Sequence, residues 1–160
     1  DQLWSPDEAK NVLQSLIPLA SIFKLGFDEA EVIWNESLSA SQYAKRFHVK
    51  PDQISIVTKG SSGAVLFDGQ NLITQESLPV DVVDPVGAGD AFVAGFLSGI
   101  FEHEISPKYL LTLEASQRKK VLRQALRMGV ICGALTCTRR GDTSAMPNAT
   151  EVQKHLNLIQ

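Results

Sequence analysis

Apolar positions in the first third of the chain predict a helix, a strand and two further helices. After Ser5 and Pro6, apolar residues recur every three or four positions, which is the spacing of one helix face. Ser5 and Glu8 fit the two ends of a capping box at the start of this helix. The next segments are predicted to be a buried parallel strand and two short helices, in the order 19–25, 28–34 and 41–48.

A second buried strand and a hairpin are predicted in the middle of the chain. Residues 54–58 read Ile-Ser-Ile-Val-Thr, a pattern typical of a strand. Residues 64–67 and 71–76 are expected to pair across Asp68-Gly69, a dipeptide that favours hairpin turns. Residues 80–83 are then interpreted as the central buried strand. Strands that alternate with helices indicate an α/β protein with a mostly parallel sheet.

Three helices are predicted in the last part of the chain. An apolar helix begins directly after a glycine turn at residues 87–89, and a polar connector follows it. A long helix is expected over residues 119–136, and a short helix over 150–156 with Thr150 as its cap. The two cysteines are five positions apart near the end of the long helix and face different sides, so neither a disulfide nor a metal pair is expected.

Composition places the chain among ordinary globular proteins. The hydrophobic content is 44%, the charged content 21% and the formal net charge -3. Basic runs are absent, which argues against a nucleic-acid partner and against a charged membrane surface. No apolar run is long enough to span a bilayer, and no secretory signal pattern is found. The expected compartment is the reducing cytoplasm, which suits buried free thiols.

The glycine turn is the strongest candidate for chemistry. Gly87 and Gly89 lack a Cβ, so the backbone can curl around a ligand. The free N–H groups of the first helical turn would point into this curl and bind an anion, above all phosphate. Asp90 at the rim suits a general base beside a phosphoryl group in transfer. The structural alternative is an ordinary strand-to-helix turn in which Asp90 is the N-cap.

Two familiar phosphate-binding motifs do not fit this turn. No Lys-Ser or Lys-Thr pair follows the glycines, which excludes a Walker A loop. Phe92 stands where a dinucleotide-binding fingerprint has its third glycine, which disfavours a dinucleotide-dependent oxidoreductase.

The segment Asp-Pro-Val-Gly-Ala-Gly-Asp-Ala-Phe at residues 84–92 resembles the signature of the ribokinase-like (PfkB) sugar kinases. The resemblance implies a ribokinase-like α/β fold with helices on both sides of its sheet. It implies that the N–H groups of Gly87, Ala88 and Gly89 form an anion hole. It also implies that Asp90 contacts the sugar and deprotonates its primary hydroxyl as this attacks the γ-phosphate of ATP, with Mg²⁺ bridging the phosphates.

Other positions match the nucleotide site of this family. Residues 58–63, Thr-Lys-Gly-Ser-Ser-Gly, resemble its nucleotide-binding turn, and the structural alternative is a plain hairpin entry loop. Near the adenine the family often has an Asn where this chain has an apolar residue. The nucleotide-binding residues implied by the resemblance are Thr58, Lys59, Gly60, Gly63 and Val130.

Three residues are implied to take part in cation binding. Glu29 matches a glutamate that organises Mg²⁺ through water, although Gly26 stands where the family motif has Asn. The alternative is a glutamate that favours the helix dipole. Asp84 and Gly141 match positions that border a monovalent cation, K⁺ in many members. Pro85 replaces the usual Thr beside Asp84, whose alternative role is to accept hydrogen bonds from turn amides.

The resemblance covers nearly the whole chain but matches only the C-terminal half of these kinases. Residues 1–160 are therefore expected to be the C-terminal part of a single kinase domain, whose absent N-terminal half carries the lid, most sugar contacts and any homo-oligomer contact. The opening Asp1-Gln2-Leu3-Trp4 resembles the tail of a segment found in 2-keto-3-deoxygluconate kinases. This predicts phosphorylation of that sugar acid at its 6-hydroxyl.

Two alternatives remain open at this point. The first is a kinase of another alcohol, such as fructose, ribose or a nucleoside. The second is a non-catalytic nucleotide-binding module that kept the fold.

Overall fold

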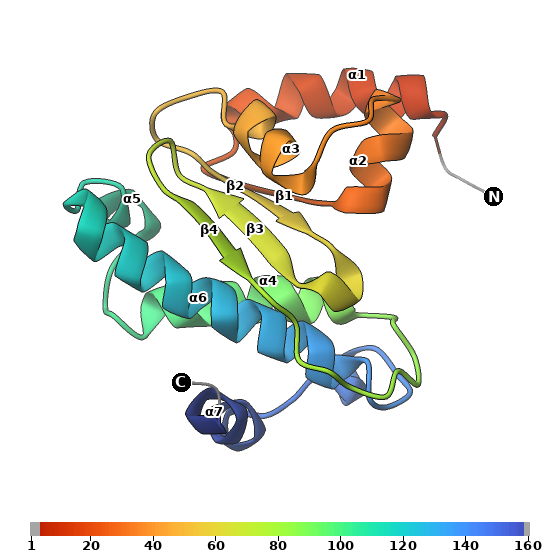
Figure 1. The fold of residues 1–160 in the computed structure, drawn as a ribbon, viewed down its shortest axis with the longest axis vertical. Coiled ribbons are helices and arrows are strands. Elements are labelled where there is room, and N and C mark those ends of the chain that lie inside the picture. The colour runs from red at the N-terminus through yellow and green to blue at the C-terminus, as the bar shows by residue number, and fades with distance from the viewer. Residues whose placement is uncertain (1–3, 159–160) are drawn as a thin grey trace. The chain divides into compact units, whose positions relative to one another are not determined.

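The computed structural model describes residues 4–158 (Figure 1). The described chain divides into two compact units. The first unit comprises residues up to 60 together with 64–74, and the second comprises 61–63 and the residues from 75 onward. The opening residues 1–3, which carry the resemblance to 2-keto-3-deoxygluconate kinases, lie outside the described residues.

The first unit holds the sheet and three helices, and their order follows the sequence-based prediction. Ser5 Oγ accepts a hydrogen bond from Glu8 N at 3.3 Å, and Glu8 Oε2 accepts one from Ser5 N at 2.9 Å, so the predicted capping box is confirmed. The elements of this unit are α1 (Pro6–Leu16), β1 (Ile22–Gly26), α2 (Phe27–Trp34), α3 (Ala40–Phe47), β2 (Ile54–Thr58), β3 (Ala64–Phe67) and β4 (Leu72–Gln75).

The sheet has the order β1-β2-β3-β4 and is mixed. β1 and β2 are parallel, with Ile22 opposite Ile54, whereas β2 and β3 are antiparallel. β3 and β4 form the predicted hairpin, whose loop is closed by a hydrogen bond from Asp68 N to Asn71 O at 3.3 Å. The α/β class is confirmed. The sheet is less parallel than predicted because these short connections cannot hold the crossover that parallel strands need.

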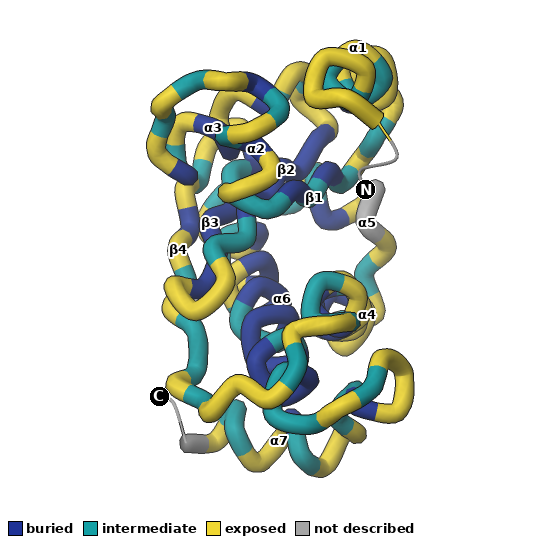
Figure 2. Tube along the Cα trace, turned by 90° about the vertical axis from the view of Figure 1, so that its right-hand side faces the viewer, coloured by how far each residue is buried: buried dark blue, intermediate teal, exposed yellow. Residues whose placement is uncertain are grey.

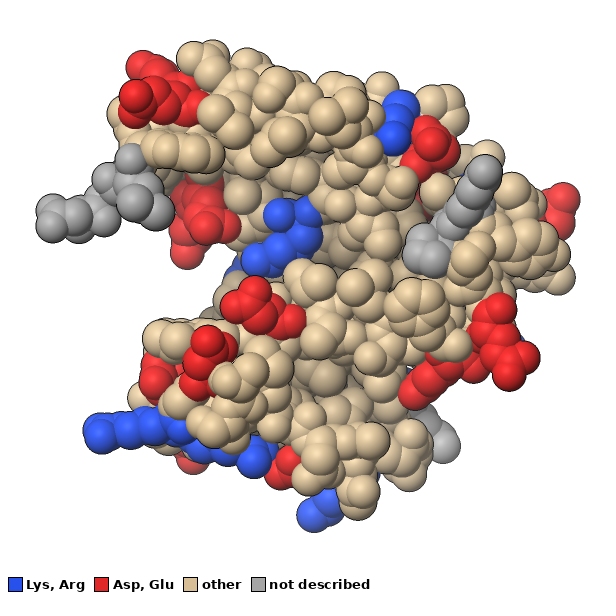
Figure 3. Space-filling view, turned by 180° about the vertical axis from the view of Figure 1, so that it is seen from behind, with Lys and Arg blue, Asp and Glu red and all other residues tan. Residues whose placement is uncertain are grey.

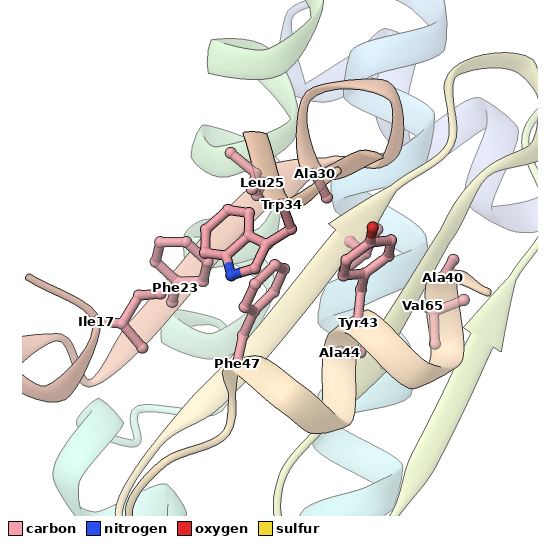
Figure 4. Packing of buried hydrophobic residues seen from close by; sticks show 11 residues of the cluster. Ile17, Phe23, Leu25, Ala30, Trp34, Ala40, Tyr43, Ala44, Phe47 and Val65 are labelled. Atoms are coloured by element: carbon pink, nitrogen blue, oxygen red, sulfur yellow. The ribbon is translucent and has the colours of Figure 1, made fainter. Parts of the chain in front are cut away.

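An aromatic cluster forms the core of the first unit (Figure 4). The Phe47 ring lies 5.2 Å from Phe23, 4.8 Å from Trp34 and 5.7 Å from Tyr43, measured between centroids. These rings come from β1, α2 and α3, and Trp34 is buried as a packing residue. The cluster therefore fixes these elements to one another and holds the β1–α2 corner, where Gly26 and Glu29 lie.

The second unit is built on two long helices that pack side by side (Figures 1 and 2). A Cβ on Gly95 would lie 2.8 Å from Met128 O, and a Cβ on Gly99 would lie 2.7 Å from Ala125 Cα. Only glycine permits this close approach of the two backbones. The helices of this unit are α4 (Ala88–Phe101), α5 (Pro107–Leu110), α6 (Ala115–Thr136) and α7 (Ala149–Leu158).

Residues 80–83 are not a buried strand, and that prediction is wrong. Val82 is 61% exposed and Val83 is 55% exposed. Val83 N instead donates a hydrogen bond to Cys137 O at 2.8 Å. The valines gave this segment the composition of a strand, but within the described residues no neighbouring strand pairs with it.

Two helix starts also differ from the prediction. The long helix begins at Ala115 rather than at residue 119. The last helix begins at Ala149, and Asn148 caps it in place of Thr150. Asn148 Oδ1 accepts a hydrogen bond from Glu151 N at 3.0 Å, and Glu151 Oε2 accepts one from Asn148 N at 2.9 Å. Asn148 is the cap because Glu151 stands three residues after it, which completes a capping box.

Two surface features and the thiols complete the description. Over residues 4–158, none of the helices combines the length and the apolar character needed to cross a membrane. On the face drawn in Figure 3, acidic and basic side chains are interspersed among uncharged ones. Cys132 is buried, as predicted for both thiols, whereas Cys137 is only half-buried.

Candidate active site

Gly87 forms the turn that begins α4 and is its N-cap. Its backbone has φ 78° and ψ -6°, which is the left-handed region that favours glycine. A Cβ at this position would also lie 2.6 Å from Asp142 Oδ1. Both the backbone conformation and the packing therefore require glycine here.

The N–H groups of this turn are not equivalent. Ala88 N donates a hydrogen bond to Pro85 O at 3.2 Å, so its N–H already has an acceptor. Gly89 and Asp90 lie in the first turn of α4, where helical N–H groups lack an intrahelical acceptor. Among the described residues no acceptor is recorded for them. The donors therefore differ from the predicted trio in two ways: Ala88 already donates to Pro85 and could take part only by breaking that bond, and Asp90 adds an N–H group.

Asp90 is the third residue of α4, and its side chain is exposed. The alternative that Asp90 is the N-cap is wrong, since Gly87 occupies that position. Across residues 4–158 no hydrogen bond or ion pair is recorded for the Asp90 carboxylate. A free carboxylate beside unpaired N–H groups can accept a proton from a hydroxyl whose phosphoryl partner is bound by those groups.

Asp84 takes part in the turn itself. Its Oδ1 accepts a hydrogen bond from Val86 N at 3.1 Å, and its own N–H donates to Cys137 O at 3.2 Å. Burial, and after it the Asp84 charge, raise the pKa of the Cys137 thiol. These contacts favour the structural alternative for Asp84, a carboxylate that accepts from turn amides. The cation-binding role stays a prediction.

The loop after α6 lies against the glycine turn. Gly141 has φ 118°, and a Cβ on it would lie 2.3 Å from Ser144 Oγ. The next residue, Asp142, places its carboxylate against Gly87. Asp142 was not predicted from the sequence, although it directly follows Gly141. Within the described residues, no group of three or more His, Cys, Asp or Glu is placed to hold a metal ion.

Glu29 lies in the first unit, at the start of α2. Its Oε2 accepts a hydrogen bond from Gly26 N at 2.8 Å, and Gly26 is the N-cap of the helix. The carboxylate is exposed. This contact supports the structural alternative, in which Glu29 stabilises the helix N-terminus, and its role with Mg²⁺ stays a prediction.

The predicted nucleotide-binding turn is shared between the units. Thr58 ends β2 and pairs with Gly26 of β1, and Lys59 is half-buried. Gly60 has φ 51° with open space where a Cβ would be. Gly63 has φ 85°, and a Cβ on it would lie 2.0 Å from Gln75 O, so glycine is required there. The Val130 side chain, in α6, is 6% exposed.

Comparison with known proteins identifies the class to which this fold and turn belong. A model of the pfkB family of carbohydrate kinases matches residues 1–149. The chain belongs to this family. The predicted resemblance to ribokinase-like kinases is confirmed at this level.

Curated relatives refine the comparison. The chain is 30% identical over 159 residues to a probable fructokinase-2 from Arabidopsis thaliana, covering 99% of this chain and 46% of that protein. It is 30% identical over 155 residues to a fructokinase from Klebsiella pneumoniae, covering 96% of this chain and 47% of that protein. The chain thus spans about half the length of these relatives. They are fructokinases, so the narrower resemblance to 2-keto-3-deoxygluconate kinases is not supported by them.

Solved structures show the same fold. The aminoimidazole riboside kinase of Salmonella enterica, solved with aminoimidazole riboside and an ATP analogue, matches with 26% identity and a TM-score of 0.69. That match covers 96% of this chain and 48% of the kinase. The fructokinase of Vibrio cholerae, solved with fructose, ADP and a calcium ion, matches with 24% identity and a TM-score of 0.73, over 95% of this chain and 46% of that one.

Proposed function

We propose that this chain carries the catalytic base and phosphate-binding turn of an ATP-dependent sugar kinase. The observation that carries the proposal is the free Asp90 carboxylate beside the unpaired N–H groups in the first turn of α4. Family membership supports the same reaction class. Because the relatives are about twice as long, the working enzyme in this proposal includes a preceding half with the lid and most sugar contacts.

Asp90 accepts the proton of a primary hydroxyl in the proposed reaction. As the hydroxyl oxygen attacks the γ-phosphorus, the bond from this phosphorus to the bridging oxygen breaks and ADP leaves. The N–H groups of Gly89 and Asp90, together with that of Gly87, stabilise the charge on the phosphoryl oxygens. The α4 dipole adds partial positive charge at the same end.

The described residues form a better binding site for the phosphates of ATP than for a metal ion held by protein side chains. The N-terminus of α4 suits a phosphate, whereas the described carboxylates form no three-ligand cluster. Mg²⁺ in kinases is held largely by substrate phosphates and water, with one or two carboxylates. We therefore assign Mg²⁺ to the ATP phosphates, with Glu29 as a ligand through water, and leave Asp84 and Gly141 as the proposed border of a K⁺ site.

Fructose is the favoured acceptor in this proposal, since the curated relatives are fructokinases. 2-Keto-3-deoxygluconate, favoured by the resemblance of the opening residues, becomes the competing substrate. A panel of fructose, 2-keto-3-deoxygluconate and ribose with the complete kinase distinguishes them by kcat/KM. Preference for the sugar acid would overturn the fructose assignment, and ATP binding without turnover on any sugar would favour the non-catalytic module.

Substitution of the proposed base tests the mechanism. Asp90→Asn in the complete kinase should lower kcat by at least about 10²–10⁴-fold, because a positioned base contributes that much. Nucleotide affinity should change only a few-fold, since the N–H donors remain. Steady-state kinetics and a calorimetric ADP titration measure the two effects.

Asp81→Asn is the matched control, because Asp81 is an exposed carboxylate that precedes the same turn. It should keep normal turnover. Near-normal turnover of Asp90→Asn would show that Asp90 is not the base.

A further inference from the structure

A cavity of about 520 Å³ lies in the second unit, between α6, α7 and the C-terminal end of α4. This volume is within the range of about 300–1,000 Å³ that is typical of small-molecule sites. Its charged lining residues are Glu102, Lys120, Arg123 and Arg127. The cavity is separate from the glycine turn, because Glu102 follows Asp90 by twelve positions along α4, roughly 18 Å of helix.

Three cations of α6 line this cavity from one helix face. Lys120, Arg123 and Arg127 are spaced three and four residues apart, which places them side by side along the helix. The cavity lining contains one carboxylate, Glu102, which accepts a hydrogen bond from Gln124 Nε2 at 3.4 Å. Three positive charges against one negative charge give the cavity an excess of positive charge that favours an anion.

The Arg127 guanidinium is held in place by a hydrogen bond, but one of its N–H donors has no acceptor within residues 4–158. Its Nη2 donates a hydrogen bond to Leu156 O at 2.7 Å, which ties the guanidinium to α7. Its Nε is buried and has no acceptor among the described residues. A buried donor without an acceptor is costly. The bond to Leu156 holds the Arg127 charge at the cavity wall, where it can attract an anion.

The uncharged lining indicates what else the ligand carries. Gln124 and Gln153 line the same cavity, and an amide side chain can donate to or accept from a hydroxyl. Gln124 Nε2 donates to Glu102, and Gln153 Nε2 donates to Asn157 Oδ1 at 3.1 Å. We propose that this cavity binds a phosphate monoester of a small polyhydroxylated molecule. The arginines and the lysine bind the phosphate, and the glutamine amides contact the hydroxyls. Sugar phosphates and nucleotides share this chemistry.

The test is a calorimetric titration of the folded 160-residue chain with three probes: glucose 6-phosphate, ADP without magnesium, and inorganic phosphate. Glucose 6-phosphate, or ADP in a step additional to any binding at the proposed nucleotide site, should bind more tightly than inorganic phosphate. Tighter binding of glucose 6-phosphate would identify the ligand as a sugar phosphate, and tighter binding of ADP would identify it as a nucleotide. Lys120→Gln combined with Arg123→Gln should lower that affinity at least about tenfold, the equivalent of one lost charge-assisted hydrogen bond. Both side chains are exposed, so folding should be retained.

Lys154→Gln is the matched control, because Lys154 is an exposed cation beside Gln153 that does not line the cavity. It should change the affinity less than about twofold, and Asp90→Asn should leave it unchanged. The proposal fails if no ester binds saturably, if inorganic phosphate binds as tightly as the esters, or if the double variant binds like the unmodified chain. The two failures are distinguishable, because the Lys120→Gln, Arg123→Gln double variant tests this cavity, whereas turnover of Asp90→Asn in the complete kinase tests the proposed kinase function.

Discussion

Single residues determine where the helices of this chain begin. Ser5, Ser39 and Asn148 each accept a hydrogen bond from an N–H of the first helical turn. Glu8, Gln42 and Glu151 return the contact to the backbone N–H of the cap. These pairs are local in sequence, so their geometry depends little on the rest of the fold. The N-cap Gly87 differs, because it lies against Asp142, a residue far along the chain.

The Glu151 cap makes the stability of α7 depend on pH. The hydrogen bond from Asn148 N, and after it the Arg139 side chain, lower the pKa of Glu151. Because the folded pKa lies below the unfolded one, this stabilisation is complete above the usual glutamate range and is lost as pH falls through the folded pKa. We expect α7 to fray in acid, between about pH 4 and the lower folded value.

Backbone chemical shifts of α7 across an acid titration measure this effect. Glu151→Gln should remove the acid transition of α7, whereas Glu76→Gln, at an exposed loop position, should leave it in place. An identical transition in Glu151→Gln would contradict the assignment.

At the scale of elements, the contact between α4 and α6 positions the candidate site. Gly133 of α6 lies against the start of α4, where a Cβ would be 3.1 Å from Ala88 O. Gly129 is equally close to Phe92 O, at 2.9 Å. The glycines on both helices let the backbones approach, so the first turn of α4 is held against the end of α6. The loop with Asp142 follows that end and therefore reaches Gly87.

Gly99→Ala tests this packing. The added Cβ would lie 2.7 Å from Ala125 Cα, a backbone atom that cannot rotate away. We expect a loss of about 1–3 kcal/mol in the free energy of unfolding, typical of overpacking in a tight core. Urea unfolding measures it, with Ser98→Ala, an exposed neighbour on the same helix, as the control. Equal stability of the two variants would mean that the helices separate at little cost.

At the scale of the whole molecule, each unit has its own core. The aromatic cluster belongs to the first unit, and a cluster around Ile131, Leu135 and Val152 belongs to the second. The candidate base and the phosphate-binding N–H groups lie in the second unit, whereas Glu29 and Thr58 lie in the first. The residues proposed to bind the nucleotide are thus divided between the two units in sequence.

A titration with Mg·ATP tests the chain at this scale. Circular dichroism first checks that the 160-residue chain is folded. The folded chain should then bind Mg·ATP saturably, because the proposed phosphate-binding groups all lie within it. Gly87→Ala should weaken binding about tenfold or more, since a side chain at this φ costs roughly 1–2 kcal/mol and disturbs the turn. Absence of binding by the folded chain would mean that the nucleotide site needs more of the protein.

The sequence by itself determined the local features of this protein. The Ser5–Glu8 capping box, the Asp68-Gly69 hairpin, the apolar helix after the glycine turn and the family signature at residues 84–92 all depend on neighbours within a few positions. Their physics is short-range hydrogen bonding and backbone preference, so a single sequence is enough to predict them. The family membership that followed from the signature was confirmed by comparison.

The tertiary structure decided what depends on distant partners. Residues 80–83 have the composition of a strand, but a strand also needs a neighbouring strand. The N–H group of Val83 instead donates a hydrogen bond to the carbonyl oxygen of Cys137. Asp142 became part of the candidate site only because α6 packs on α4. The cavity with Arg127 likewise requires α7 to fold back onto α6. Long-range contacts of this kind leave no periodic signal in the chain, because each one joins residues that the sequence keeps far apart.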